Sequence, residues 1–125
     1  MDTEAKKLLD HSVSDLLSLE TMFFFSDFAG AAIDLAALSS RLGCDAAPVK
    51  RALASLTRAG IVECSRLGAG RYELYSYTKD TDLRAAVRRL SKYYHEDPNS
   101  QVEIIRHIVA KKVRAGRKAR TSGAV

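Results

Sequence analysis

The first strong pattern along the chain is an apolar segment with helical spacing over residues 12–28. The apolar side chains that fall on one helix face are Val13, Leu16, Leu17, Phe24 and Phe28. We predict a helix here that begins at Ser12, with Asp15 in its first turn, and ends at Gly30. Residues 2–10 read as a short first helix or as an extension of this one.

This predicted helix is apolar around more than one face, because further apolar residues lie between the positions of the first stripe. A helix of that kind is buried on more than one side. In so small a protein a second subunit is a natural partner for the extra face, and we therefore expect a homodimer. The residues expected at the dimer interface are Leu16, Leu19, Met22, Phe23 and Phe25.

Two shorter helical patterns follow, separated by a tight turn. After a brief extended piece, Asp34 can cap a helix over 35–42 that ends at Gly43. Asp45 can cap the next helix, which stops at Gly60. The apolar residues of that helix share one face and are Val49, Ala52, Leu53 and Leu56. The short glycine-containing turn between the two helices matches a helix-turn-helix.

Beyond Gly60 the apolar spacing changes to that of strands, and then returns to that of helices. Residues 61–65 and 72–77 predict two strands joined by a turn at 68–70, and together they make a hairpin. A helix starting near Asp80 follows, and Asp97 with Pro98 predicts the start of a last helix that frays near Gly116. The residues that we expect the last helix to bury are Val102, Ile105, Ile108 and Val109.

Composition adds a size and a location to this picture. The chain has 125 residues, of which 46% are hydrophobic and 28% charged, which is enough for one core. No segment approaches the roughly 18 apolar residues of a membrane span, and no signal peptide is recognisable. We therefore expect one domain over residues 1–115, a disordered basic tail over 116–125, no membrane contact and a cytoplasmic location.

Charge is distributed unevenly along the chain, whose net charge is +5. Residues 1–34 contain two lysines and seven acids, whereas residues 35–71 contain six basic residues and two acids. Residues 103–125 contain seven basic residues and one acid. Positive charge gathered in this way suits a polyanion such as nucleic acid. The alternative is that an acidic helix neutralises a basic one within the fold.

Residue patterns that would indicate catalysis or metal binding are missing. The two cysteines, Cys44 and Cys64, have no pairing motif, and the histidines at 11, 95 and 107 lack metal-ligand spacing. The glycines at 68 and 70 are not followed by the lysine and helix of a phosphate-binding loop. We therefore expect no enzyme activity, no metal and no cofactor.

The segments DLAALSSRLGCD (34–45) and VKRALASLTRAGIV (49–62), followed by the predicted hairpin, carry a family resemblance. Over residues 31–77 the chain resembles bacterial winged helix-turn-helix transcriptional regulators of the MarR-like and ArsR-like groups. The resemblance implies a mainly α fold with a small β-hairpin, flanked by N- and C-terminal helices over 12–28 and 81–115. It also implies a dimeric, nucleoid-associated regulator that binds double-stranded DNA.

A helix presented by a tight turn can lie in the major groove, with the hairpin as a wing on the minor groove or the backbone. The residues expected to contact DNA are Ser39, Arg41, Lys50, Arg51, Arg58, Arg66 and Arg71. The basic tail could add non-specific phosphate contacts through Lys111, Lys112, Arg114, Arg117, Lys118 and Arg120. Each group also has a plainer interpretation, as a solvated helix face, as hairpin-edge charges or as a solubilising end.

A second function stays open at this point, namely a winged-helix module that binds another protein without sequence-specific DNA binding. Three features favour it: the very apolar stretch from Met22 to Phe25, the acidic N-terminal part, and a helix front rich in alanine. That front, which includes Ala46, Ala47 and Ala54, offers few hydrogen bonds to bases.

Overall fold

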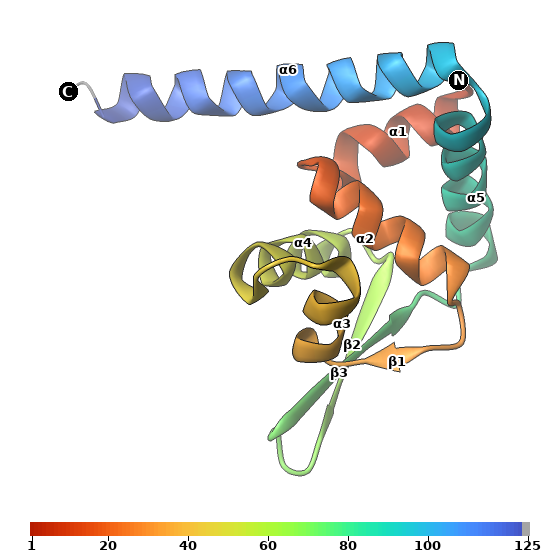
Figure 1. Ribbon diagram of the computed structural model, residues 1–125, viewed down its shortest axis with the longest axis vertical. Coiled ribbons are helices and arrows are strands. Elements are labelled where there is room, and N and C mark those ends of the chain that lie inside the picture. The colour runs from red at the N-terminus through yellow and green to blue at the C-terminus, as the bar shows by residue number, and fades with distance from the viewer. Residues whose placement is uncertain (124–125) are drawn as a thin grey trace.

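The computed structural model describes the backbone of residues 1–123 and the side chains of residues 1–114. Six helices and three strands follow one another along this part of the chain (Figure 1). Their bounds are α1 Thr3–Ser12, α2 Leu16–Asp27, β1 Ala32–Ile33, α3 Leu35–Leu42, α4 Ala46–Arg58, β2 Val62–Leu67, β3 Tyr72–Tyr77, α5 Thr81–Glu96 and α6 Pro98–Gly123. None of these helices is both long and apolar enough to span a bilayer.

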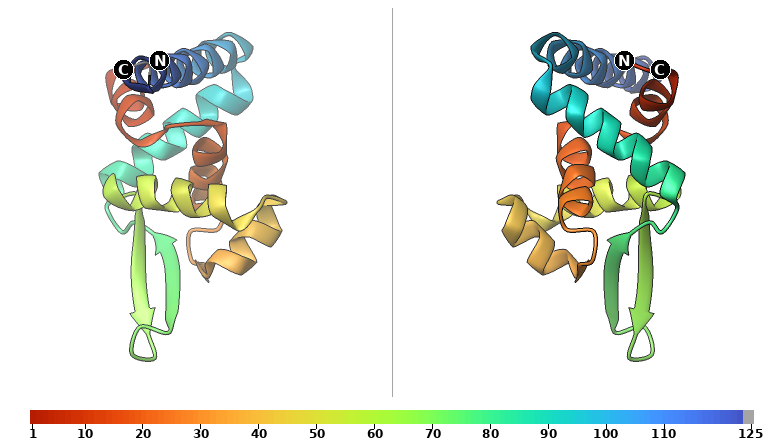
Figure 2. Two further views of the ribbon diagram at one scale, coloured as in Figure 1. Left: turned by 90° about the vertical axis from the view of Figure 1, so that its left-hand side faces the viewer. Right: turned by 90° about the vertical axis from the view of Figure 1, so that its right-hand side faces the viewer.

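The molecule has two ends of different character. α3, α4 and the hairpin of β2 and β3 form one end, and the hairpin projects away from the rest (Figure 2). α1, α5 and α6 form the other end, and α2 lies between, where it contacts α4, α5 and β3. The predicted class, a winged helix-turn-helix with flanking helices, is confirmed.

The three strands form an antiparallel sheet in the order β1-β3-β2. β2 pairs with β3 from Val62 opposite Tyr77 to Leu67 opposite Tyr72. At the tip, the backbone N–H of Arg71 donates to the carbonyl of Gly68 at 3.2 Å. Ala69 adopts a φ of 58°, a left-handed conformation that disfavours a side chain. The hairpin is therefore a wing with a tight, slightly strained tip.

The two helices of the helix-turn-helix end by the same backbone motif. The N–H groups of Gly43 and Cys44 donate to the carbonyls of Ser40 and Ser39, at 3.3 and 3.1 Å. Gly43 has a φ of 66°, which only glycine adopts freely. Gly60, with a φ of 78°, closes α4 in the same way. Both predicted helix ends are confirmed.

The start of α2 differs from the prediction. Ser12 is the last residue of α1, so it does not begin α2, and α1 is a separate helix. The cap is Asp15, whose carboxylate accepts the N–H of Ser18 at 2.8 Å, while the Ser18 hydroxyl accepts the N–H of Asp15 at 3.1 Å. This reciprocal pair satisfies donors at both positions, which explains why the helix starts here. α2 also ends at Asp27, before Gly30.

The apolar residues of α2 belong to the core of the single chain. Leu19, Met22, Phe23 and Phe25 are buried without any second subunit, so the prediction that they form a dimer interface is wrong. Of the five residues predicted, only Leu16 is exposed. The physical reason is that α2 is enclosed by elements of its own chain, among them α4, α5 and β3.

α6 carries two apolar faces, and the prediction mixed them: Ile108 is buried as predicted, but Val102, Ile105 and Val109 are exposed. Ile104 and Ile108 are buried, together with Ser100. A second stripe at the spacing of one helix face is exposed, at 47% for Val102, 37% for Ile105, 54% for Val109 and 47% for Val113. At 3.6 residues per turn the two faces lie on roughly opposite sides of the helix. The body of the protein covers only one of them.

The structure describes the backbone of the predicted basic tail as far as Gly123 and its side chains as far as Arg114. The backbone is helical as far as Gly123, so α6 does not end near Gly116 as predicted. The disorder predicted for 116–125 does not agree with this helical backbone up to Gly123, and residues 124–125 lie outside the described residues. The side chains of Arg117, Lys118 and Arg120 also lie outside them.

Candidate nucleic-acid interface

α4 presents a basic front on an apolar back. Val49, Leu53 and Leu56 are buried against the core, which fixes the rotation of the helix about its own axis. Lys50 and Arg51 are then exposed on the other side. The small residues of the same front are also exposed and are Ala46, Ala47 and Ala54. The arrangement leaves a smooth surface that another molecule can approach closely.

On α3 the structure separates two residues that were predicted together. Arg41 is exposed in the last turn of α3. Ser39 is buried, and its hydroxyl donates to the carbonyl of Leu35 at 2.8 Å, so it does not face solvent as a contact residue would. Sequence reasoning could have found this, because Ser39 stands four residues after Leu35 on the apolar face. Its neighbour Ser40 is exposed and was not among the predicted residues.

A groove of about 480 Å³ separates the N-terminal parts of α3 and α4 from the wing. Lys50 of α4 and Arg71 at the base of the wing tip both line it. Among the described residues, no acid lies within ion-pair distance of either side chain. The groove therefore brings together two of the cations that the sequence predicted to bind DNA.

The two acids of this groove are engaged by other groups. The carboxylate of Asp34 accepts the N–H of Ala37 at 2.8 Å as the cap of α3. Glu73 accepts the phenol of Tyr75 at 3.1 Å and lies 3.6 Å from the Arg66 guanidinium. Burial raises the pKa of Tyr75 to about 12, and the bond to Glu73 acts in the same direction, so the phenol remains a donor.

The wing tip combines cations with exposed apolar side chains. Arg66 and Arg71 flank the turn, and the paired residues Leu67 and Tyr72 are both exposed. The ion pair of Arg66 with Glu73 is open to solvent, and such pairs contribute only about 0–1 kcal/mol. Arg66 can therefore exchange this partner for another anion at little cost.

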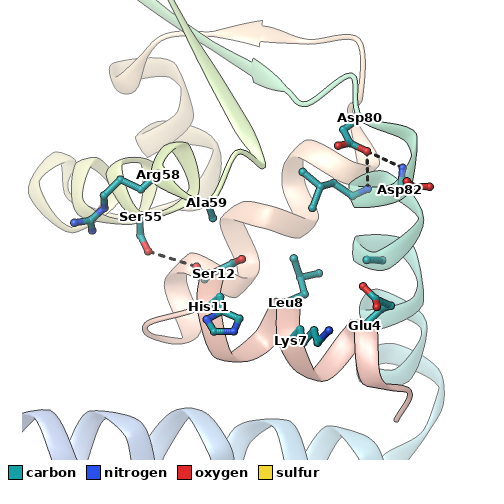
Figure 3. Close-up of a pocket in the computed structure, with 12 residues that line it drawn as sticks. Glu4, Lys7, Leu8, His11, Ser12, Ser55, Arg58, Ala59, Asp80 and Asp82 are labelled. Atoms are coloured by element: carbon teal, nitrogen blue, oxygen red, sulfur yellow. Dashed lines mark hydrogen bonds between the residues drawn. The ribbon is translucent and has the colours of Figure 1, made fainter.

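Arg58, the last residue of α4, lies apart from this groove. It lines a separate cavity of about 570 Å³ between the end of α4, α1 and the start of α5 (Figure 3). Other ionisable residues of that cavity are Glu4, Lys7, His11, Asp80 and Asp82. The sequence grouped Arg58 with Lys50 and Arg51. In the structure Arg58 is exposed at the C-terminal end of α4 and does not line the groove that contains Lys50.

The described part of the basic tail also behaves unlike a free arm. Lys111 donates to backbone carbonyls of Asp10 and Val13, at 3.0 Å for Val13, whereas Lys112 and Arg114 are exposed. α6 lies at the end of the molecule opposite the wing (Figure 2).

The described residues contain no group of three His, Cys, Asp or Glu side chains arranged to hold a metal ion. Cys44 and Cys64 are free thiols.

No protein-family model matches the chain, and no curated protein matches it by sequence. Solved structures do match. A possible transcriptional regulator from Methanosarcina mazei has a TM-score of 0.55 and 21% identity, with 80% of this chain and 83% of that chain covered. The adhesin competence repressor AdcR from Streptococcus pyogenes has a TM-score of 0.53 and 14% identity, with 95% and 86% covered.

A mutant of MepR from S. aureus, solved bound to an oligodeoxyribonucleotide, is also similar to this chain. Its TM-score is 0.59 at 13% identity, with 98% of this chain and 87% of that chain covered. At such identities the likeness establishes the fold. The chain therefore has the same fold as these transcriptional regulators, and it is the winged-helix fold that the sequence resemblance implied.

Proposed function

We propose that the protein is a transcriptional regulator that binds double-stranded DNA as a homodimer. In this proposal α4 enters the major groove and the wing lies on the minor groove or the backbone. The observation that carries it is the shared groove, in which Lys50 of α4 and Arg71 of the wing stand free of acidic partners. A neighbouring structure with bound oligodeoxyribonucleotide has the same fold, which supports this use of it.

The proposed contacts divide into two kinds. Lys50 and Arg51 stand near the start of α4, where a recognition helix meets base edges. Arg41, Arg66 and Arg71 are exposed around them and suit phosphates. Because the alanine front offers few hydrogen bonds, each subunit alone selects sequence weakly. Reading two half-sites from one dimer restores selectivity.

The exposed stripe of α6 supports a second copy of the chain as the dimer partner. Val102, Ile105, Val109 and Val113 extend over about 17 Å of helix at 1.5 Å per residue. A two-fold axis through the stripe would place the same residues of both copies against each other. Glu103 and Arg114 lie on one flank near its two ends, so an antiparallel copy sets Glu103 opposite Arg114 of the partner subunit.

The apolar stretch from Met22 to Phe25, which favoured a protein-binding module, no longer supports that alternative. Phe23 and Phe25 of the apolar stretch are buried in the core, so that stretch offers no docking surface. The acidic N-terminal part and the alanine-rich front of α4 are what remain of that alternative. The DNA-binding experiment described next also tests this protein-binding alternative. A regulator of the proposed kind acts in the cytoplasm at the nucleoid.

The test is a titration of a fluorescent random duplex, followed by anisotropy, with the full chain and with Lys50→Ala combined with Arg51→Ala. We expect the double variant to weaken binding by about tenfold or more, since each contact of this kind contributes roughly 1–3 kcal/mol. The matched control is Arg88→Ala with Lys92→Ala, which removes the same charges from exposed positions on α5. Equal binding by the double variant and the parent would contradict the assignment of α4. No binding by any form at low salt would favour the protein-binding alternative.

A further inference from the structure

The end of α1 is the point where α1 meets side chains from both α4 and α6. The last carbonyls of a helix have no partners within the helix and must find them elsewhere. Lys111 of α6 donates to the carbonyls of Asp10 and Val13. Ser55 of α4 donates to the carbonyl of Ser12 at 3.4 Å (Figure 3). The same turn of α1 is therefore bonded to the proposed recognition helix and to the proposed dimer helix.

The link to α6 is the stronger of the two. The Lys111 ammonium lies at the C-terminal end of α1, where the helix dipole favours a positive charge. One turn earlier on α6, the Nε2 atom of His107 lies 2.6 Å from the carboxylate of Asp10. These contacts join residues about a hundred positions apart in the sequence, so they fix how α6 lies across α1 rather than any local structure.

The hydrogen bond between α1 and α4 is made by Ser55, which lies between the buried face and the exposed face of α4. Ser55 is half-buried, next to the fully buried Leu56 and one residue after the exposed Ala54 of the DNA-facing front. A hydrogen bond at this position contacts the side of α4 and leaves its exposed basic front unoccupied. The link therefore constrains the direction of the helix and does not compete with contacts to DNA.

We infer that the last turn of α1 is a joint that, together with the packing of α4 on α2, α2 on α5 and α5 on α6, sets the angle between α4 and α6, with Lys111 and Ser55 as its positioning residues. The inference rests on the proposed function in one respect: in a dimer built on α6, that angle fixes the distance between the two copies of α4. Half-site spacing on DNA follows from that distance. The joint therefore determines which spacing the dimer accepts, and it leaves the contacts within each half-site unchanged.

Lys111 and Lys112 provide a matched pair for the test. They are adjacent and equally charged, but Lys111 is bonded to α1 and Lys112 is exposed. Lys111→Met removes the donor and keeps the length of the side chain, and Lys111→Arg keeps a donor. Lys112→Met removes the same charge without touching the joint. Ser55→Ala removes the second link by a change too small to unfold the chain.

The first measurement is the distance between spin labels on α4 and α6. Ala54→Cys and Ala110→Cys supply exposed label positions in a Cys44→Ser, Cys64→Ser background, with labelled protein diluted into unlabelled protein. We expect a narrow distribution for the parent, for Lys111→Arg and for Lys112→Met. Lys111→Met should broaden it, and Ser55→Ala should broaden it less. Identical distance distributions for Lys111→Met and Lys112→Met would contradict the inferred role of the joint, whether or not the protein binds DNA.

The second measurement compares duplexes that carry one half-site or two half-sites at varied spacing. Lys111→Met should keep its affinity for one half-site within about twofold of that of Lys112→Met. At the preferred spacing of two half-sites it should lose about fivefold or more relative to that control, and its spacing preference should widen. Lys111→Arg should restore the parent's preference. Parallel losses for Lys111→Met and Lys112→Met on every duplex would show Lys111 to be a phosphate contact and would overturn its role as a positioning residue. Failure of the parent to bind any duplex would instead contradict the proposed function.

Discussion

The two ends of this molecule are stabilised by different kinds of interaction. In the winged end, α3 and α4 are delimited by bonds between neighbours in sequence, such as Asp34 to Ala37 and Cys44 to Ser39. In α2, which lies between the two ends, and in α6 of the helical end, apolar side chains such as Phe25 and Ile104 pack against residues far away in the sequence. The local bonds give the proposed DNA surface its shape, and the long-range packing gives it a rigid base.

The largest expected effect is in α2, which joins the two ends. Phe25→Ala removes a fully buried ring from α2 and should lower the free energy of unfolding by about 3–5 kcal/mol. Phe28→Ala is the control, because Phe28 is half-exposed and such changes usually stay within about 1 kcal/mol. Urea denaturation measures both. Equal costs for the two variants would mean that α2 is not the core of the single chain.

The next largest effect is expected from the exposed apolar face of α6, as opposed to its buried face. Ile105→Ser with Val109→Ser should weaken the proposed dimer by roughly a hundredfold, because apolar burial would be lost from both subunits. The helix content should stay unchanged, since both side chains are exposed in the single chain. Sedimentation at several concentrations measures the dissociation, with Leu67→Ser on the wing as an exposed apolar control. A double variant that remains as dimeric as this control would place the interface elsewhere.

A smaller effect is expected from the backbone of the winged end. Gly43→Ala forces a side chain into the left-handed conformation and should cost about 1–2 kcal/mol in the free energy of unfolding. No neighbouring atom would obstruct the new methyl group, so the cost is conformational. Gly30→Ala meets equally open space without a positive φ and should be nearly neutral. Thermal denaturation distinguishes them, and a neutral Gly43→Ala would mean that the turn adapts.

The smallest effect compares two aspartates that precede helices. Asp34 accepts a backbone N–H of α3, whereas the side chain of Asp45 makes no capping bond to α4. Asp34→Ala should therefore cost about 1 kcal/mol of stability, and Asp45→Ala less than about 0.5 kcal/mol. Thermal denaturation of the two variants measures this difference in stability. A larger loss for Asp45→Ala would reveal a cap that forms in solution.

The elements that the sequence predicted well are those with local signals. Asp34, Gly43 and Gly60 mark helix boundaries by capping and by backbone freedom, and the structure places those boundaries as predicted. Local signals also have limits. Ser12 and Asp45 have the right side chains for caps, but the chain caps α2 with Asp15 and leaves the side chain of Asp45 unused.

The partners of an apolar face could not be predicted in the same way. Phe23 and Phe25 indicated burial, but spacing along one helix does not say whether its own chain or a second chain covers it. Ile105 and Ile108 both fit an apolar helix, and only packing against the body distinguishes the buried residue from the exposed one. The site shows the same limit, because Lys111 has the charge of a DNA contact but donates to backbone carbonyls at the end of α1.

The most direct test of the account compares DNA binding by the full chain and by a chain that ends at Arg114. Anisotropy of a fluorescent duplex is measured for both at about 50 and 200 mM salt, a range over which phosphate contacts lose most of their contribution. The account predicts that the shortened chain still binds and that its affinity still falls steeply with salt, because the contacts belong to α4 and the wing. Loss of binding on removal of residues 115–125 would contradict it and would reduce DNA binding to a non-specific arm.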